Sequence, residues 1–109
     1  MRKKSKLSQV PRQIEQLFRR AASEPWLLEF GPHALEGMAR DNLDVDDLIY
    51  AVLHAYSVER EPDENSWAPW KYIICGELAD GFRVYTVGKL LRDEDAKEVY
   101  WFVTAHAAA

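Results

Sequence analysis

Residues 71–87 read KYIICGELADGFRVYTV, and this stretch decides the fold. Apolar and β-branched residues fill both halves, and Asp80 and Gly81 lie between them. An Asp-Gly pair between two such runs predicts a β-hairpin with a tight two-residue turn and strands over 71–79 and 82–87. Leu78 would then lie opposite Arg83. One face of the hairpin would carry Ile74, Leu78, Arg83, Tyr85 and Val87, so an arginine would share a mostly apolar face.

The segments on either side extend this hairpin. Residues 92–97 are charged and predict a turn, and the β-branched and aromatic run 99–106 predicts a third strand. Upstream, residues 59–65 are acidic and contain Pro62, which indicates a surface loop. The C-terminal half of the chain is therefore predicted to be a three-stranded meander.

The N-terminal half is predicted to be helical. Apolar residues at spacings of three and four indicate an amphipathic helix over 8–24. The short apolar run 26–30 reads as a brief strand or extended link, and Pro32 suits the first turn of a helix over 32–41. Asp44 can cap a further helix whose apolar stripe reaches Tyr56. Together these elements predict an α+β fold with N-terminal helices packed on a small antiparallel β-meander.

Length and composition limit the class of protein. The chain has 109 residues, which suits one domain over 8–109 preceded by a basic arm over 1–7. Cys75 is the only cysteine, so no intramolecular disulfide can form, which fits a reducing compartment. No apolar run approaches the length of a membrane span or follows the basic start as a signal peptide would. We therefore expect a cytoplasmic protein without a membrane segment.

The formal net charge of −4 is unevenly distributed. Residues 1–20 hold seven Lys or Arg and one Glu, which gives +6 and leaves −10 on the rest of the chain. The candidate nucleic-acid-binding residues of the arm are Arg2, Lys3, Lys4 and Lys6, because lysine and arginine neutralise phosphates. The arm could equally lie on an acidic protein surface or keep the N-terminus soluble.

Three stretches carry a resemblance to a known family: FGPHALEGMARDNLDVDDLIYAVLHAYSVE (30–59), KYIICGELADGFRVYTVGKL (71–90) and VYWFVTAHA (99–107). They resemble the bacterial domain-of-unknown-function family numbered 4258, with a His-Ala-Leu helix at the start and a Thr-Ala-aromatic strand at the end. The pattern is also similar to the RelE and BrnT group of small toxins. The agreeing residues are His33, Ala34, Leu35, Met38, Thr104 and Ala105.

The resemblance implies helices on a short antiparallel sheet and metal-independent RNA cleavage that an antitoxin neutralises. The expected partners are an RNA substrate and a protein, either an antitoxin or a target protein. The chain departs from the family at two positions, since Gly37 and Asp41 stand where arginines are usual. His106 stands where the family commonly has tyrosine, although some RelE-like toxins place a histidine near the C-terminus.

Metal-independent RNA cleavage requires a base for the 2′-hydroxyl, an acid for the leaving oxygen and cations for the developing charge. The candidates on the predicted strands and the following turn are His106, Arg83, Lys89, Arg92 and Tyr85. His33 could orient a catalytic group or make only local contacts. The strand-end arginines could equally pair with surface carboxylates.

No cofactor or metal site is expected, because the three histidines have no i, i+4 pair and no nearby thiols, and no phosphate-binding glycine loop is present. Trp67 and Trp70 flank Pro69 and are candidate anchors for a protein partner. Two hypotheses follow: a RelE-like toxin-type ribonuclease of a toxin–antitoxin or phage-defence system, or a catalytically inactive binding module such as a regulator, immunity factor or phage-encoded inhibitor. Missing arginines and acidic charge favour the second.

Overall fold

The structure, a computed structural model, describes residues 4–63, 68–92 and 94–108. Within these residues three α-helices pack on a six-stranded mixed sheet, which confirms the predicted α+β class. The helices are α1 (Arg12–Ala21), α2 (Pro32–Arg40) and α3 (Val45–Leu53), with a 3-10 turn, η1 (Pro25–Leu27), between the first two. The strands are β1 (Ser5–Leu7), β2 (Leu28–Phe30), β3 (Ala55–Pro62), β4 (Trp70–Glu77), β5 (Arg83–Arg92) and β6 (Glu98–Ala107).

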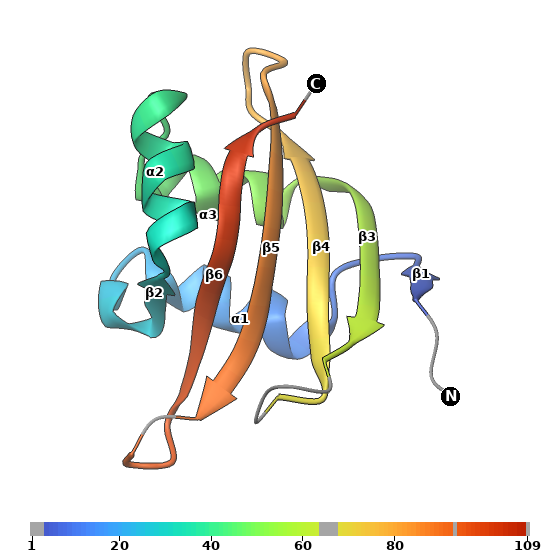
Figure 1. Cartoon of the computed structure of the whole chain (residues 1–109), viewed down its shortest axis with the longest axis vertical. Helices are drawn as coiled ribbons and strands as arrows, with labels where there is room; N and C mark the ends of the chain where they lie inside the picture. Colours follow the sequence, from blue (N-terminus) through green and yellow to red (C-terminus); the bar gives the residue numbers. More distant parts are fainter. Residues whose placement is uncertain (1–3, 64–67, 93, 109) are drawn as a thin grey trace.

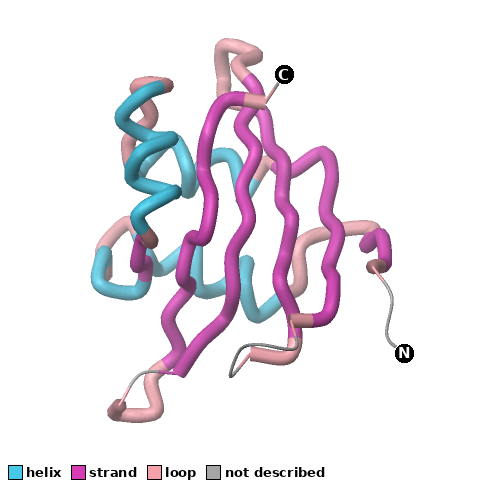
Figure 2. The backbone as a smooth tube through the Cα atoms, viewed as in Figure 1, coloured by secondary structure: helices cyan, strands magenta, loops and turns pink. Residues whose placement is uncertain are grey.

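The sheet has the strand order β1-β3-β4-β5-β6-β2. Strands β4, β5 and β6 form the predicted antiparallel meander. The structure adds β3 and β1 on one side, both antiparallel, and β2 on the other, parallel to β6. Helices α1 and α3 lie behind the sheet and α2 lies beside β6 (Figure 1). The tube view shows the same division, with the sheet as one layer and the helices as another (Figure 2).

The core forms between α1, α3 and one face of the sheet. Phe18 of α1 makes edge contacts with Tyr100 and Phe102 of β6, at ring-centroid distances of 4.9 and 5.8 Å. Such edge-to-face contacts add to the stabilisation that burial of the rings provides. Thr86 is fully buried in the same core, and its hydroxyl donates a hydrogen bond to the carbonyl of Ile74 at 2.7 Å. The contacts of Phe18 show that the predicted apolar stripe of α1 is the side of the helix that packs against the sheet.

The capped start of α3 is confirmed. The Asp44 carboxylate accepts a hydrogen bond from the backbone N–H of Asp47 at 2.8 Å, and the Asp47 carboxylate accepts one from the N–H of Asp44 at 3.0 Å. This reciprocal pair satisfies two backbone donors that the helix itself leaves unpaired.

The predicted loop was wrong over residues 59–62, and the predicted extension of the helix to Tyr56 was also wrong, because residues 55–62 form β3. Residues 64 and 65 of that predicted loop lie outside the described residues. Val58 is buried in the core, whereas the neighbouring Glu59 and Glu61 lie on the other face of the sheet. A strand with one polar face resembles a loop in composition. Its pairing with β1, which is distant in sequence, and with β4, the next strand along the chain, determines its structure.

The predicted hairpin register was also wrong by one residue. The N–H of Leu78 donates to the carbonyl of Phe82 at 2.8 Å, so three residues, not two, form the turn. Gly81 occupies the position with positive φ, at 89°, as a three-residue hairpin loop requires. Arg83 consequently pairs with Glu77, and Ile74 lies on the helix-covered face, away from Arg83.

Helix α2 covers the edge of β6 beyond the end of β2. A Cβ atom on Gly37 would lie 2.1 Å from the carbonyl oxygen of Ala105, so only glycine permits this approach. At the end of the helix, the Asp41 carboxylate accepts a hydrogen bond from the backbone N–H of Ala107 at 2.7 Å. This contact pairs a strand-edge donor that β2 does not reach.

Candidate functional site

The side chains on the sheet face turned away from α1 and α3 include several of the predicted site residues. Side chains alternate between the two faces of a strand, and Ile74, Val84 and Thr86 are buried in the core. The residues between them therefore lie on the opposite face. We call this surface the open face, and in its upper half it comprises Cys75, Glu77, Arg83, Tyr85, Val87, Thr104 and His106.

Tyr85 and His106 meet on the open face. They are register partners on β5 and β6, their ring centroids are 5.0 Å apart, and the ring planes differ by 21°. Both side chains are half-buried, so each retains contact with solvent. The stack fixes the orientation of the imidazole against a neighbouring phenol.

The hydrogen bonding of His106 decides which ring nitrogen can act as a base. Its Nδ1 lies 2.7 Å from the carbonyl oxygen of Ala107. A carbonyl can only accept, so Nδ1 donates in this contact and carries the proton. In the neutral imidazole the lone pair then belongs to Nε2, as a general base requires.

Arg83 lies two residues before Tyr85 on the same face of β5. Its guanidinium carbon is 5.0 Å from the centroid of the Tyr56 ring, and its Nε donates to the Glu77 carboxylate at 3.3 Å. Arg83 is exposed, so this pairing leaves it accessible to a ligand. Three of the predicted catalytic residues, Arg83, Tyr85 and His106, thus share one end of the open face.

The other three predicted catalytic residues lie elsewhere. Lys89 is on the open face but farther along β5, where it forms an ion pair with Asp63 at 2.5 Å. Arg92 ends β5 opposite Glu98 and lines a cavity beside α1. His33 is highly exposed on α2, with its Nδ1 3.8 Å from Glu36. The predicted six-residue cluster is therefore not assembled as one group.

Carboxylates accompany the cations of the open face. Lys71 lies 3.3 Å from Glu61, in addition to the Arg83–Glu77 and Lys89–Asp63 pairs. These contacts reduce the positive field that the face presents to a phosphate backbone.

The predicted nucleic-acid-binding arm is described only in part. Ser5–Leu7 form β1, and Lys4 lies 3.6 Å from Glu59 of β3. Lys6 is exposed and is the register partner of Glu59. Arg2 and Lys3 lie outside the described residues.

The two tryptophans predicted as partner anchors differ in what the structure describes. Trp70 is half-buried at the start of β4, and the Arg60 guanidinium carbon lies 4.0 Å from the centroid of its ring. Trp67 lies outside the described residues. The anchor role of both stays a prediction.

Sequence reasoning missed two residues of the open face. Tyr56 was assigned to the apolar stripe of a helix, but it lies at a bulge of β3 and is half-exposed. Cys75 was treated only as a sign of compartment, yet its thiol lies among the open-face side chains, where burial raises its pKa. The sequence around Tyr56 contains no pattern that reveals a bulge, and for this reason the residue was wrongly assigned to a helix.

Residues 4–63, 68–92 and 94–108 contain no group of three or more His, Cys, Asp or Glu side chains placed to hold a metal ion. No helix in these ranges is long and apolar enough to cross a membrane. Comparison of the chain with protein-family models, with curated proteins and with solved structures finds no match.

Proposed function

We propose that the protein is a RelE-like, toxin-type endoribonuclease whose active site is the upper half of the open face. The observation that carries the proposal is the Tyr85–His106 stack, in which the Nε2 lone pair of His106 is left for a substrate proton. Arg83 lies on the same face. This arrangement combines a base, a phenol and a cation, the three kinds of group that the reaction needs.

In the proposed reaction, His106 Nε2 removes the proton from a ribose 2′-hydroxyl. The 2′-oxygen forms a bond to phosphorus as the bond from phosphorus to the 5′-oxygen breaks, and the Tyr85 hydroxyl gives its proton to that leaving oxygen. Arg83 stabilises the negative charge that develops on the phosphoryl oxygens. The products are a 2′,3′-cyclic phosphate and a 5′-hydroxyl end. A neutralising protein partner is part of this proposal, on the basis of the family resemblance. A cytoplasmic location is also part of it, on the basis of the single cysteine.

The nature of the products tests this function. Purified protein is incubated with a single-stranded RNA oligonucleotide in EDTA, with and without ribosomes, and the ends are identified by mass spectrometry. The matched control is the same oligonucleotide with 2′-deoxyribose at the cleaved positions. We expect cyclic phosphate ends from the RNA and no cleavage of the control. Cleavage of the deoxy control would contradict attack by the 2′-hydroxyl.

A second candidate function is a catalytically inactive protein-binding module. The ion pairs Arg83–Glu77 and Lys89–Asp63 favour it, because they leave the open face with little excess positive charge. Growth arrest on expression, relieved by the product of a neighbouring gene, supports the toxin. RNA that stays intact in every condition above supports the binding module.

A further inference from the structure

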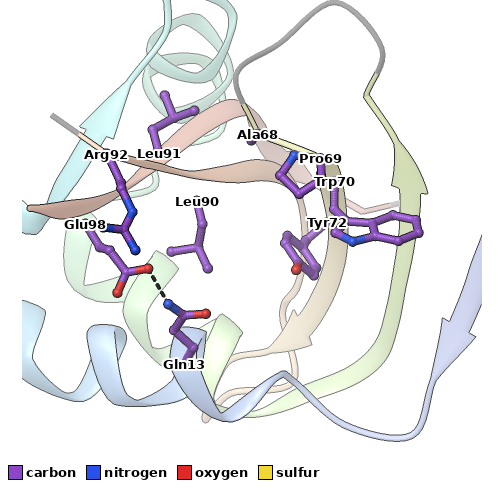
Figure 3. A pocket seen from close by; sticks show the side chains of 9 residues that line it. All are labelled: Gln13, Ala68, Pro69, Trp70, Tyr72, Leu90, Leu91, Arg92 and Glu98. Atoms are coloured by element: carbon purple, nitrogen blue, oxygen red, sulfur yellow. Dashed lines mark hydrogen bonds between the residues drawn. The ribbon is translucent and has the colours of Figure 1, made fainter. Parts of the chain in front are cut away.

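A cavity that the proposed ribonuclease does not use lies at the other end of the same strands. It is formed where β4 and β6 begin and β5 ends, with α1 beside it (Figure 3). Its volume is about 550 Å³, within the range of about 300 to 1,000 Å³ that is typical of small-molecule sites. We call it the terminal cavity. It is lined by Gln13, Ala68, Pro69, Trp70, Tyr72, Leu90, Leu91, Arg92 and Glu98.

Six of the nine lining residues are apolar or aromatic, and part of the lining is held rigidly. Tyr72 is a buried residue of β4, and Leu90 packs against the core from β5. The Arg60 guanidinium, 4.0 Å from the centroid of the Trp70 ring, covers that indole. A guanidinium over an indole is a favourable cation–π contact. These walls therefore offer flat surfaces in a defined orientation.

The charged residues at the terminal cavity are not equivalent. Glu98 is engaged, because its carboxylate accepts a hydrogen bond from the side-chain amide of Gln13, drawn as a dashed line in Figure 3. The side chain of Arg92 is exposed at the rim and makes no hydrogen bond or ion pair with any residue in the described ranges. Behind Trp70, the Nε of Arg60 is buried without a hydrogen-bond partner among those residues. The Gln13 amide is neutral and leaves the charge of Glu98 in place, so the lining itself holds one guanidinium and one carboxylate. The Arg60 guanidinium over the Trp70 ring adds a second positive charge, and this excess favours an anionic ligand.

We propose that the terminal cavity binds a small carboxylic acid with a flat apolar body. The ligand carboxylate pairs with the Arg92 guanidinium, and its body lies against Tyr72 and Leu90. The planar fork of arginine matches a carboxylate with two parallel hydrogen bonds. This site is independent of the proposed ribonuclease, because none of its lining residues belongs to the upper open face.

The test uses 2-naphthoate as the probe, with 2-naphthalenemethanol and 2-naphthylmethylammonium as neutral and cationic analogues. Two-dimensional ¹H–¹⁵N spectra of the full chain report on the four tryptophans through their indole N–H signals. The Trp70 signal is identified by its loss in Trp70→Phe. We expect 2-naphthoate to shift this signal saturably, with a lower Kd than either analogue. If the Trp70 signal shows no saturable shift with 2-naphthoate up to about 10 mM, any binding is too weak to be useful, and the proposal is overturned.

Substitution of the arginine tests the charge at the rim. Arg92→Gln keeps hydrogen-bond donors but loses the charge, and we expect the Kd for 2-naphthoate to rise at least about 10-fold. Arg19→Gln is the matched control, because Arg19 is an exposed arginine of α1 outside the cavity lining, and its Kd should equal that of the wild type. Tighter binding of the ammonium analogue would assign the anchor to Glu98 and overturn the proposal. An equal Kd in wild type and Arg92→Gln would also overturn it.

Discussion

The Asp41 carboxylate accepts a hydrogen bond from the backbone N–H of Ala107 at 2.7 Å, which joins the end of α2 to the end of β6. One helical turn earlier, Gly37 allows the helix backbone to contact the carbonyl of Ala105. These are the two positions at which the resemblance drawn from the sequence led us to expect arginine. In this chain both residues serve the packing of α2 on β6.

The Asp41 contact predicts a pH-dependent stability. Hydrogen bonds from Arg40 first, and then from the Ala107 backbone, lower the pKa of Asp41 in the folded state. When folding lowers the pKa of a carboxyl group, that group stabilises the protein at any pH above its pKa in the unfolded state, which is near 3.9. The stabilisation is lost as the pH falls through the pKa of the folded state. In urea unfolding, wild type should be more stable than Asp41→Asn at pH 7, and the difference should shrink below about pH 4. A difference that grows on acidification would contradict the contact.

Gly37→Ala should destabilise the protein although alanine is the better helix former. Alanine in an exposed helix position gains up to about 1 kcal/mol over glycine. Here the new methyl would meet the Ala105 carbonyl, and overpacking of this kind costs about 1 to 3 kcal/mol. The exposed Ala39 of the same helix serves as the reference, since Ala39→Gly measures propensity alone. A gain in the free energy of unfolding for Gly37→Ala would show that α2 does not approach β6 so closely.

Tyr100→Phe should leave stability unchanged or raise it by up to about 1 kcal/mol. The Tyr100 hydroxyl is fully buried, and no hydrogen-bond partner for it is found among the described residues. Burial also raises the pKa of Tyr100, so the phenol stays neutral. Thr86→Val is the contrasting variant: it removes a buried hydroxyl that donates to Ile74, and it should cost about 1 kcal/mol or more. Thermal or urea unfolding compares the two, and a larger loss for Tyr100→Phe than for Thr86→Val would contradict this account.

Local sequence patterns were sufficient to predict the elements whose signals are local. The stripe of α1, the cap of α3 and the three strands of the meander all follow from spacing, capping residues and β-branched runs. Strand β2 lies within the apolar run 26–30, which was predicted as a brief strand or extended link. Strand β1 carries no such pattern, because a segment of three residues shows no periodicity. Both strands form only because β3 and β6 offer unpaired edges to them.

In the candidate site, too, the contacts between neighbouring strands of the meander were predictable from the sequence, and the others were not. Tyr85 and His106 lie on neighbouring strands of the meander, so a correct strand assignment already places them near each other. Arg92 was misplaced because β5 continues to that residue, and alternation then turns its side chain toward α1. The Lys89–Asp63 pair joins β5 to a residue following β3, a contact that no pattern within either segment indicates.

We propose His106 as the base of an RNA-cleaving site, and parallel rate measurements on two histidine variants test this role. His54 is the matched control: it is exposed, stacks on Tyr50 at a centroid distance of 3.9 Å, and has its Nδ1 2.9 Å from a backbone carbonyl, as His106 has on the open face. Initial rates of RNA cleavage in EDTA should fall at least about 100-fold in His106→Ala, the low end for the loss of an acid–base group, and stay at the wild-type value in His54→Ala. Equal rates in wild type and His106→Ala, or RNA left intact by the wild type with and without ribosomes, would contradict the claim.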